Sequence, residues 1–339
     1  MKSYALNDDN GKEYAEMYQV AHMYYDLGML QPEISEKMFF SRSKVSRLLK
    51  RARELGVVQI VVKKIFNRME QLEKALCNTF NLKDAVVITN YDEGPDDSLE
   101  ALTDFAAHYV SELLQGNCTV GITRGSTINS VVDKLNKLHD CRLQLVQLMG
   151  SSSSSYQAEE SHALVNRMLS KFGGAAHYLN TPLYIDDLYA KNILMEDNTV
   201  KAVFKRMEQC NIVLTGIGAL DIAASSRPGW HGYMTGRHYQ ELQEKDAVGS
   251  ICAQYFDING KYVPSEWNAK CISMPLEQIG KDRTSIGIAQ GQDKVRSILG
   301  ALRGNHINVL ITNVRTAADI IALNEQNLSD ASETEVSGQ

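Results

Sequence analysis

From residue 83 to residue 326 the chain alternates short β-rich runs with helical stretches, and this alternation constrains the fold more than any other feature. Short apolar runs predict buried strands, and the stretches between them have helical spacing. Such alternation builds a parallel sheet with crossover helices, so we predict an α/β domain with a Rossmann-like sheet. Strands are predicted at 85–89, 119–123, 143–149, 176–179, 212–217, 247–254, 285–289 and 308–312, and helices at 98–115, 127–138, 158–171, 199–209, 236–243, 292–303 and 315–325.

Composition is that of a globular protein. Of the 339 residues, 44% are hydrophobic, which is enough for a sizeable core. No apolar run approaches the roughly 18 residues that a membrane span needs, and the polar start from Met1 to Glu13 is unlike a signal peptide. The six cysteines are scattered, without CxxC pairs or Cys/His clusters, which predicts reduced cysteines and no metal site. We therefore expect a cytoplasmic protein without membrane contact.

The first 64 residues predict a separate winged helix-turn-helix domain. Apolar residues at three-to-four spacing indicate helices over 13–27 and 44–55, with a short helix between them, and residues 57–62 predict a β wing. The capping and turn residues are Gly28 after the first helix, Pro32 at the start of the second, Ser41 as N-cap of the third and Gly56 after it.

Positive charge is concentrated in this region. Residues 31–64 hold nine Lys and Arg against three Glu, a local net charge of +6 in a chain of net charge −6. A basic module on an acidic body can contact phosphates without the body binding DNA. We predict that the third helix enters the major groove of DNA; the alternative is a solvated surface helix. The predicted DNA contacts are Ser41, Arg42, Ser43, Lys44, Ser46, Arg47, Lys50 and Arg51.

Residues 65–82 predict a connecting helix with a narrow apolar seam. A seam of this kind either pairs with its twin in a dimer or packs on its own effector domain, and the sequence does not choose between them. The effector domain is predicted over 83–326. Residues 327–339 are polar and predict a loose tail. The seam residues are Phe66, Met69, Leu72, Leu76 and Phe80.

One strand runs directly into a Gly/Ser/Thr loop and then into a helix, which predicts an anion-binding site. Glycine permits close backbone approach, and the amide groups of a helix N-terminus point at the anion. Neither GxxxxGK[ST] nor GxGxxG is present, so no nucleotide cofactor is expected. On its own, such a loop could simply cap a helix. The residues concerned are Thr123, Arg124, Gly125, Ser126 and Thr127.

Several motifs in order resemble the SorC family of sugar-responsive regulators, related to DeoR-type effector domains. Residues 43–58 resemble the family's DNA-binding domain, and residues 121–127 match its GxTxGxT-like element. Residues 249–260 resemble its element ending in F-D-x-x-G, and residues 288–312 its element ending in N-x-L-I-T. The match covers nearly the whole chain.

The resemblance implies a fold like that of the sugar-phosphate isomerases and deaminases, with a phosphorylated sugar held at strand ends. By position, residues 123–127 would hold the phosphate, while Asp257 and Lys294 would engage the sugar hydroxyls and the phosphate. Taken alone, Asp257 could be a turn residue and Lys294 a solvated lysine at a helix start. The family also implies a homo-dimer or homo-tetramer whose DNA binding responds to the effector.

Two rival functions stay open. One is a sugar-phosphate isomerase or deaminase fused to a DNA-binding module, because fold alone does not decide function. Against it, Asp221 lacks the following Gly-His of such deaminases and the histidines form no recognisable triad, so no catalytic residue is predicted. The other rival is a constitutive DNA binder with a vestigial pocket. It is suggested by departures from the family at Gln290, Asn313 and 150–155.

Overall fold

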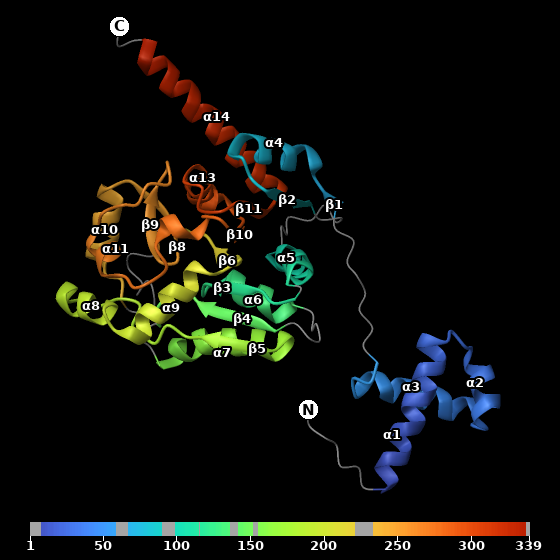
Figure 1. Ribbon diagram of the computed structural model, residues 1–339. Helices are drawn as coiled ribbons and strands as arrows, with labels where there is room; N and C mark the ends of the chain where they lie inside the picture. Colours follow the sequence, from blue (N-terminus) through green and yellow to red (C-terminus); the bar gives the residue numbers. More distant parts are fainter. Residues whose placement is uncertain are drawn as a thin grey trace. The chain divides into compact units, whose positions relative to one another are not determined.

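The computed structural model describes residues 8–58, 67–89, 99–114, 116–135, 142–151, 155–220 and 233–336. The chain divides into two compact units, Met1–Ile65 and Phe66–Gln339. Figure 1 shows the helical first unit in blue and the larger α/β unit in the remaining colours. Within the described ranges, no helix combines the length and the apolar character that crossing a membrane requires.

The first unit consists of helices around one small apolar core. Its elements are α1 (Asp8–Ala21), the π-helix η1 (His22–Asp26), α2 (Gln31–Met38) and α3 (Arg42–Glu54). Gly28 and Gly56 adopt positive φ angles after the first and third helices, as predicted. The hydroxyl of Ser41 accepts a hydrogen bond from the Lys44 amide at 3.2 Å, so Ser41 caps α3 as expected. The core side chains are Met17, Val20, Ala21, Ile34, Val45, Leu48, Leu49 and Ala52.

The start of α2 agrees with the sequence, whereas most of the predicted wing lies outside the described residues. Pro32 lies in the first turn of α2, where its missing amide proton costs nothing. Val57 and Val58 follow α3 without forming a strand. The remaining residues of the predicted wing, 59–62, lie outside the described residues.

In the described part of the second unit, eight strands form one sheet in the order β1-β2-β11-β10-β6-β3-β4-β5. Only the edge pair β1–β2 is antiparallel, and the other neighbours run parallel. The α/β class is therefore as predicted. The strands are β1 (Asn67–Arg68), β2 (Asp84–Thr89), β3 (Thr119–Ile122), β4 (Leu143–Gln147), β5 (Gly174–His177), β6 (Ile212–Gly216), β10 (Thr284–Ile288) and β11 (Val309–Asn313).

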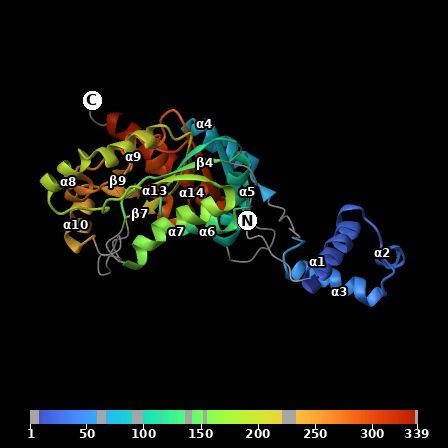
Figure 2. The same cartoon turned by 60° about the horizontal axis from the view of Figure 1, so that its bottom comes forward.

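Helices cover both faces of this sheet (Figures 1 and 2). Strand β2 shows why its sequence is continuously apolar: Val86 and Ile88 join the core on one face, while Ala85 and Val87 join the core on the other. The first face carries α5 (Leu99–Leu113), α6 (Ser126–Lys134) and α7 (Ser155–Phe172). The second carries α4 (Glu70–Phe80), α9 (Asn198–Glu208), α13 (Val295–Arg303) and α14 (Val314–Val336).

A second, three-stranded sheet corrects one prediction. The single strand expected at 247–254 is a hairpin of β8 (Ala247–Ile251) and β9 (Gln254–Asp257), and β8 also pairs with β7 (Gly218–Ala219). Cys252 and Ala253 turn the chain with φ angles of 51° and 62°. Neither residue type usually adopts the left-handed region, so the sequence carried no turn signal there.

The connecting helix is shorter than the predicted 65–82, because Asn67 and Arg68 form strand β1 instead, and the tail also differs from expectation. Helix α4 begins at Glu70, and its Leu76 and Phe80 are buried in the core of the second unit. This part of the seam therefore packs on its own domain, whereas Met69 precedes the helix and is 38% exposed, and Phe66 lies outside the described residues. The polar residues after Asn327 continue α14 as far as Val336, so the expected loose tail was wrong over that stretch.

Further short helices had no counterpart in the prediction. They are α8 (Leu188–Met195), α11 (Glu266–Lys270) and α12 (Leu276–Ile279). The helix expected at 292–303 begins as a 3₁₀ turn, η4 (Gln292–Lys294), before α13, and α10 spans Gly236–Glu244.

Candidate effector site and DNA-binding surface

The order of the large sheet reverses between β3 and β6. Strands β4 and β5 continue outward on one side of β3, whereas the later strands β6, β10 and β11 lie on its other side. In the parallel register Ile122 lies beside Leu214, so both strands end at the same edge. Open α/β sheets bind ligands outside the carboxyl ends of the strands at such a reversal. The β3–α6 loop (residues 123–127) leaves the sheet at this point.

The β3–α6 loop leaves the start of α6 open to an anion. The N-cap of α6 is Gly125, so no side chain of that residue occupies the first-turn amides. A Cβ atom built on Gly125 would meet nothing within 4 Å. Thr127 is buried in the first turn and Ser126 is exposed. The amides and the positive end of the helix dipole can therefore face an anion.

Thr123 positions this loop through β6. Its amide donates to Leu214 O at 3.1 Å, and its hydroxyl lies 3.3 Å from the Thr215 hydroxyl. The Thr215 hydroxyl donates in turn to Gly216 O at 2.9 Å. Thr123 is buried, and this series of hydrogen bonds fixes where β3 ends relative to β6. Thr123 is one of the residues predicted from the sequence, whereas Thr215 was assigned no role there, because a single threonine in a strand carries no distinguishing pattern.

Lys294 approaches the same edge from η4. Its ammonium Nζ donates to Ile217 O, just past the end of β6, at 3.1 Å. Burial lowers the pKa of Lys294, and the neighbouring Asp293 opposes that shift. A nearby anion would stabilise the charged form of a half-buried ammonium whose hydrogen-bond acceptor is a neutral carbonyl. The structure therefore brings Lys294 and the β3–α6 loop to the same strand, β6.

Asp257 occupies a different place. Its Oδ1 accepts hydrogen bonds from the amides of Asn259 and Lys261, both at 2.9 Å, which builds the turn after β9. A Cβ atom on Gly300 would lie 2.7 Å from Asp257 O, so this turn packs on α13 well after its start. The two hydrogen bonds that Asp257 Oδ1 accepts are those of a turn residue, and Lys294 lies at the other end of that helix.

Arg124 lines a narrow cavity between the ends of β3 and β4 and helix α7. Gln147, which the sequence argument did not select, lines the same cavity and is buried. Among the described residues, the cavity is lined by Ile122, Arg124, Gln147, Met149, Leu164 and Val165.

Helix α3 presents exposed polar and basic side chains on the face opposite its core stripe. Within the described ranges, no carboxylate lies within ion-pair distance of Arg47. The Lys50 ammonium is 3.8 Å from the carboxylate of Glu54, a weak exposed pair. The exposed side chains on this face are Arg42, Ser43, Ser46, Arg47 and Lys50.

Two other predicted DNA contacts are held by α1. Lys44 pairs with Glu16 at 2.7 Å and lies 3.6 Å from the centre of the Phe40 ring. Arg51 pairs with Glu13 at 3.1 Å. These ion pairs partly neutralise the charges of Lys44 and Arg51 within the first unit. We therefore place both residues at the border of the outward face of α3 rather than at its centre.

Comparison with known proteins decides the family. The family model described as "Putative sugar-binding domain" matches residues 64–322. The chain belongs to the SorC family of transcriptional regulators. It is 29% identical to the sorbitol operon regulator of Klebsiella pneumoniae over 91% of this chain and 98% of that protein. It is 30% identical to the deoxyribonucleoside regulator of Bacillus subtilis over 89% of this chain and 96% of that protein.

The fold of this SorC-family regulator agrees with a solved relative. The crystal structure of full-length SorC from Klebsiella pneumoniae superposes with a TM-score of 0.66 and 29% identity. The match covers 92% of this chain and 99% of that chain. Both units therefore have counterparts in one known regulator.

One departure of this SorC-family chain from the family pattern is structurally mild. Asn313 stands where Asp is more usual, and its Oδ1 accepts a hydrogen bond from the Thr316 amide at 2.9 Å. An aspartate would cap the start of α14 through the same kind of oxygen. The Thr316 hydroxyl also accepts from the Gly291 amide at 3.0 Å, which fixes the loop before Lys294.

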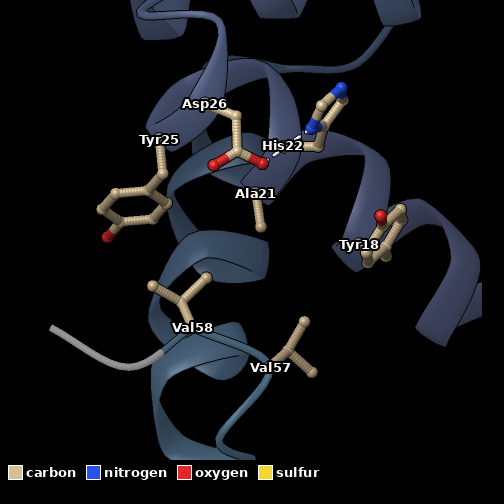
Figure 3. A pocket seen from close by; sticks show the side chains of 7 residues that line it. All are labelled: Tyr18, Ala21, His22, Tyr25, Asp26, Val57 and Val58. Atoms are coloured by element: carbon tan, nitrogen blue, oxygen red, sulfur yellow. Dashed lines mark hydrogen bonds and ion pairs between the residues drawn. The ribbon is translucent and has the colours of Figure 1, made fainter. Parts of the chain in front are cut away.

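A groove of about 430 Å³ lies on the first unit (Figure 3). Tyr18, His22 and Tyr25 line it from α1 and η1, while Val57 and Val58 line it from the segment after α3. His22 Nδ1 and Asp26 Oδ2 are 2.7 Å apart at its rim. None of the lining residues belongs to the outward face of α3, so this groove is separate from the surface predicted to contact DNA.

Proposed function

We propose that this SorC-family regulator binds operator DNA through α3 and that a phosphorylated sugar at the β3–β6 edge controls that binding. The observation that carries the effector part is that two features lie at the carboxyl edge beside β6: the α6 N-terminus without a side-chain cap, and the Lys294 ammonium, which donates to Ile217 O just past β6. The helix dipole and free amides of α6, together with the Lys294 ammonium, favour a phosphate over a neutral group.

The proposed DNA-binding element is a helix-turn-helix formed by α2 and α3. Phe39 makes the turn between them with a left-handed φ of 54°. The exposed basic face of α3 then enters the major groove, as recognition helices do. We further propose a cytoplasmic homo-dimer or homo-tetramer, in which the effector changes subunit pairing and so the spacing of two recognition helices.

A thermal-shift screen of the full-length protein tests the effector proposal. Phosphorylated sugars are compared with their unphosphorylated counterparts, because a ligand that binds only the folded state raises its stability with saturation. A shift that requires the phosphate supports the proposal. Equal shifts with and without phosphate would contradict it.

Arg47→Ala is expected to weaken binding to operator DNA by about 10- to 100-fold, as loss of a base-contacting arginine does. Arg51→Ala should cost less, because Glu13 already engages that guanidinium. The measurement is an electrophoretic mobility shift with DNA selected from a random library by the full-length protein.

The matched control for these variants is Arg237→Ala, which removes the same charge from an exposed position on α10. It should leave DNA affinity nearly unchanged at fixed salt. Equal affinity of Arg47→Ala and the unmodified protein would remove α3 from the proposed groove contact.

A further inference from the structure

We infer that Gln147 recognises a hydroxyl group of the effector beside its phosphate, and so selects phosphorylated polyols and sugars over their deoxy analogues. The inference rests on the proposed function, because it takes the phosphate to lie at the β3–α6 loop.

The orientation of the Gln147 amide follows from its partner. Gln147 is 4% exposed, and its Nε2 donates to Met149 O at 2.7 Å. A backbone carbonyl only accepts hydrogen bonds, so the nitrogen must face Met149 and the oxygen must point elsewhere. The assignment of nitrogen and oxygen is therefore fixed by chemistry.

The Gln147 carbonyl oxygen lacks a donor. Oε1 is buried, and no group of the described residues donates a hydrogen bond to it. Buried polar atoms are nearly always paired, because an unpaired acceptor forfeits its hydrogen bonds to water. The unpaired Gln147 oxygen lies at the carboxyl ends of the strands, where the geometry suits a ligand. This indicates that the ligand supplies the hydrogen-bond donor.

The surroundings of Gln147 indicate which chemical group of the ligand donates to Oε1. Gln147 lines one cavity with Arg124, a residue of the β3–α6 loop, and with Met149, two residues past the end of β4. The cavity measures about 10 Å³, room for one water-sized group. The oxygens of a dianionic phosphate ester only accept hydrogen bonds and cannot serve Oε1. A hydroxyl is small, donates one hydrogen bond and accompanies phosphate in sugar phosphates.

The test measures binding to the full-length protein by calorimetry. The probes are inorganic phosphate, ribose 5-phosphate with 2-deoxyribose 5-phosphate, and glucose 6-phosphate with its 2-deoxy and 3-deoxy analogues. Gln147→Met keeps the length of the side chain and removes the acceptor. Gln144→Met is the matched control, because Gln144 lies on the same strand but contacts His177 at 3.0 Å.

The unmodified protein is expected to prefer a hydroxylated probe over one of its deoxy analogues by about fivefold or more. Gln147→Met should abolish that preference and leave inorganic phosphate affinity within about twofold, whereas Gln144→Met should keep the preference. Thermal unfolding without ligand checks folding, and Gln147→Leu repeats the test if the first variant is unstable.

Two results would overturn the inference, and they are distinguishable. If phosphates bind but Gln147→Met keeps the same preference between hydroxylated and deoxy probes, an ordered water satisfies Oε1, and the proposed function stands. If no phosphorylated probe binds the unmodified protein, the proposed function and the inference fail together.

Discussion

Replacing Lys294 with methionine is expected to weaken binding of a phosphorylated effector about 100-fold or more, while operator binding without effector stays unchanged. The Lys294 ammonium is half-buried, and among the described residues its hydrogen-bond acceptor is the Ile217 carbonyl. Removing one partner of a desolvated charge pair typically costs about 2–5 kcal/mol. Calorimetry with the sugar phosphate found in the thermal-shift screen measures the loss.

The pH dependence gives the Lys294 prediction a second measurement. Burial lowers the pKa of Lys294 in the unliganded protein, and a bound phosphate would raise it again. Affinity should therefore be full at neutral pH and should fall as pH rises through the unliganded pKa. Lys294→Met should lose this alkaline dependence. Lys205→Met, which removes an exposed lysine of α9, should keep it.

A Lys294→Met protein that binds the effector as tightly as the unmodified protein would contradict the proposed site. Thermal unfolding without ligand separates this outcome from misfolding. Methionine fills a similar volume and removes a buried charge, so we expect no loss of stability.

The sequence predicted the large sheet well because burial on both faces leaves a continuous apolar run. Strand β2 is an example, since Val86 and Val87 face opposite cores and both must be apolar. Strand order was beyond the sequence, because the return of β6 beside β3 depends on contacts between distant segments. That order is what places the β3–α6 loop at a ligand-binding edge.

Residues that adopt a backbone conformation rare for their amino-acid type could not be predicted from the sequence. The turn at Cys252 and Ala253 uses left-handed backbone without glycine or asparagine. Helix α8 has no buried residue among its eight, so it lacks the one-sided apolar pattern that identifies a helix.

Within the candidate sites the sequence identified segments better than individual roles. The β3–α6 loop was predicted, but the hydroxyl of Thr123 faces Thr215 rather than open space. Gln147 was missed because a buried amide is recognised only from its missing partner. On α3, the pairs of Lys44 and Arg51 with α1 depend on tertiary packing that helix periodicity does not contain.

Trp267→Ala is expected to destabilise the second unit by about 3–5 kcal/mol, the usual cost of truncating a buried large aromatic residue. Trp267 is fully buried in α11, stacks on Tyr184 with ring centres 5.0 Å apart, and donates from Nε1 to Ala253 O at 2.7 Å. Truncation therefore leaves a cavity and takes the indole hydrogen bond from the Ala253 carbonyl, which keeps only the weaker one from Cys271 Sγ at 3.9 Å. Urea unfolding followed by circular dichroism measures the change.

Two variants separate the contributions to the Trp267 effect. Trp267→Phe keeps most of the stacking and loses only the indole hydrogen bond and some volume, so its cost should be intermediate. Tyr189→Ala removes an aromatic ring that is 75% exposed and should change stability by about 0.5 kcal/mol or less. Equal stabilities of Trp267→Ala and Tyr189→Ala would contradict the buried position of Trp267.

The effect of Trp267→Ala should also reach the effector site, through the hairpin that Trp267 holds. Ala253 belongs to the turn between β8 and β9, and Gly249 of β8 lies so close to α13 that an added Cβ would be 2.2 Å from Ser297 Cβ. Ser297 follows Lys294 by three residues. Loosening the hairpin should therefore loosen the start of α13, so hydrogen exchange should rise over 247–257 and 292–298 together. An increase confined to 247–257 would show that α13 holds Lys294 without support from the hairpin.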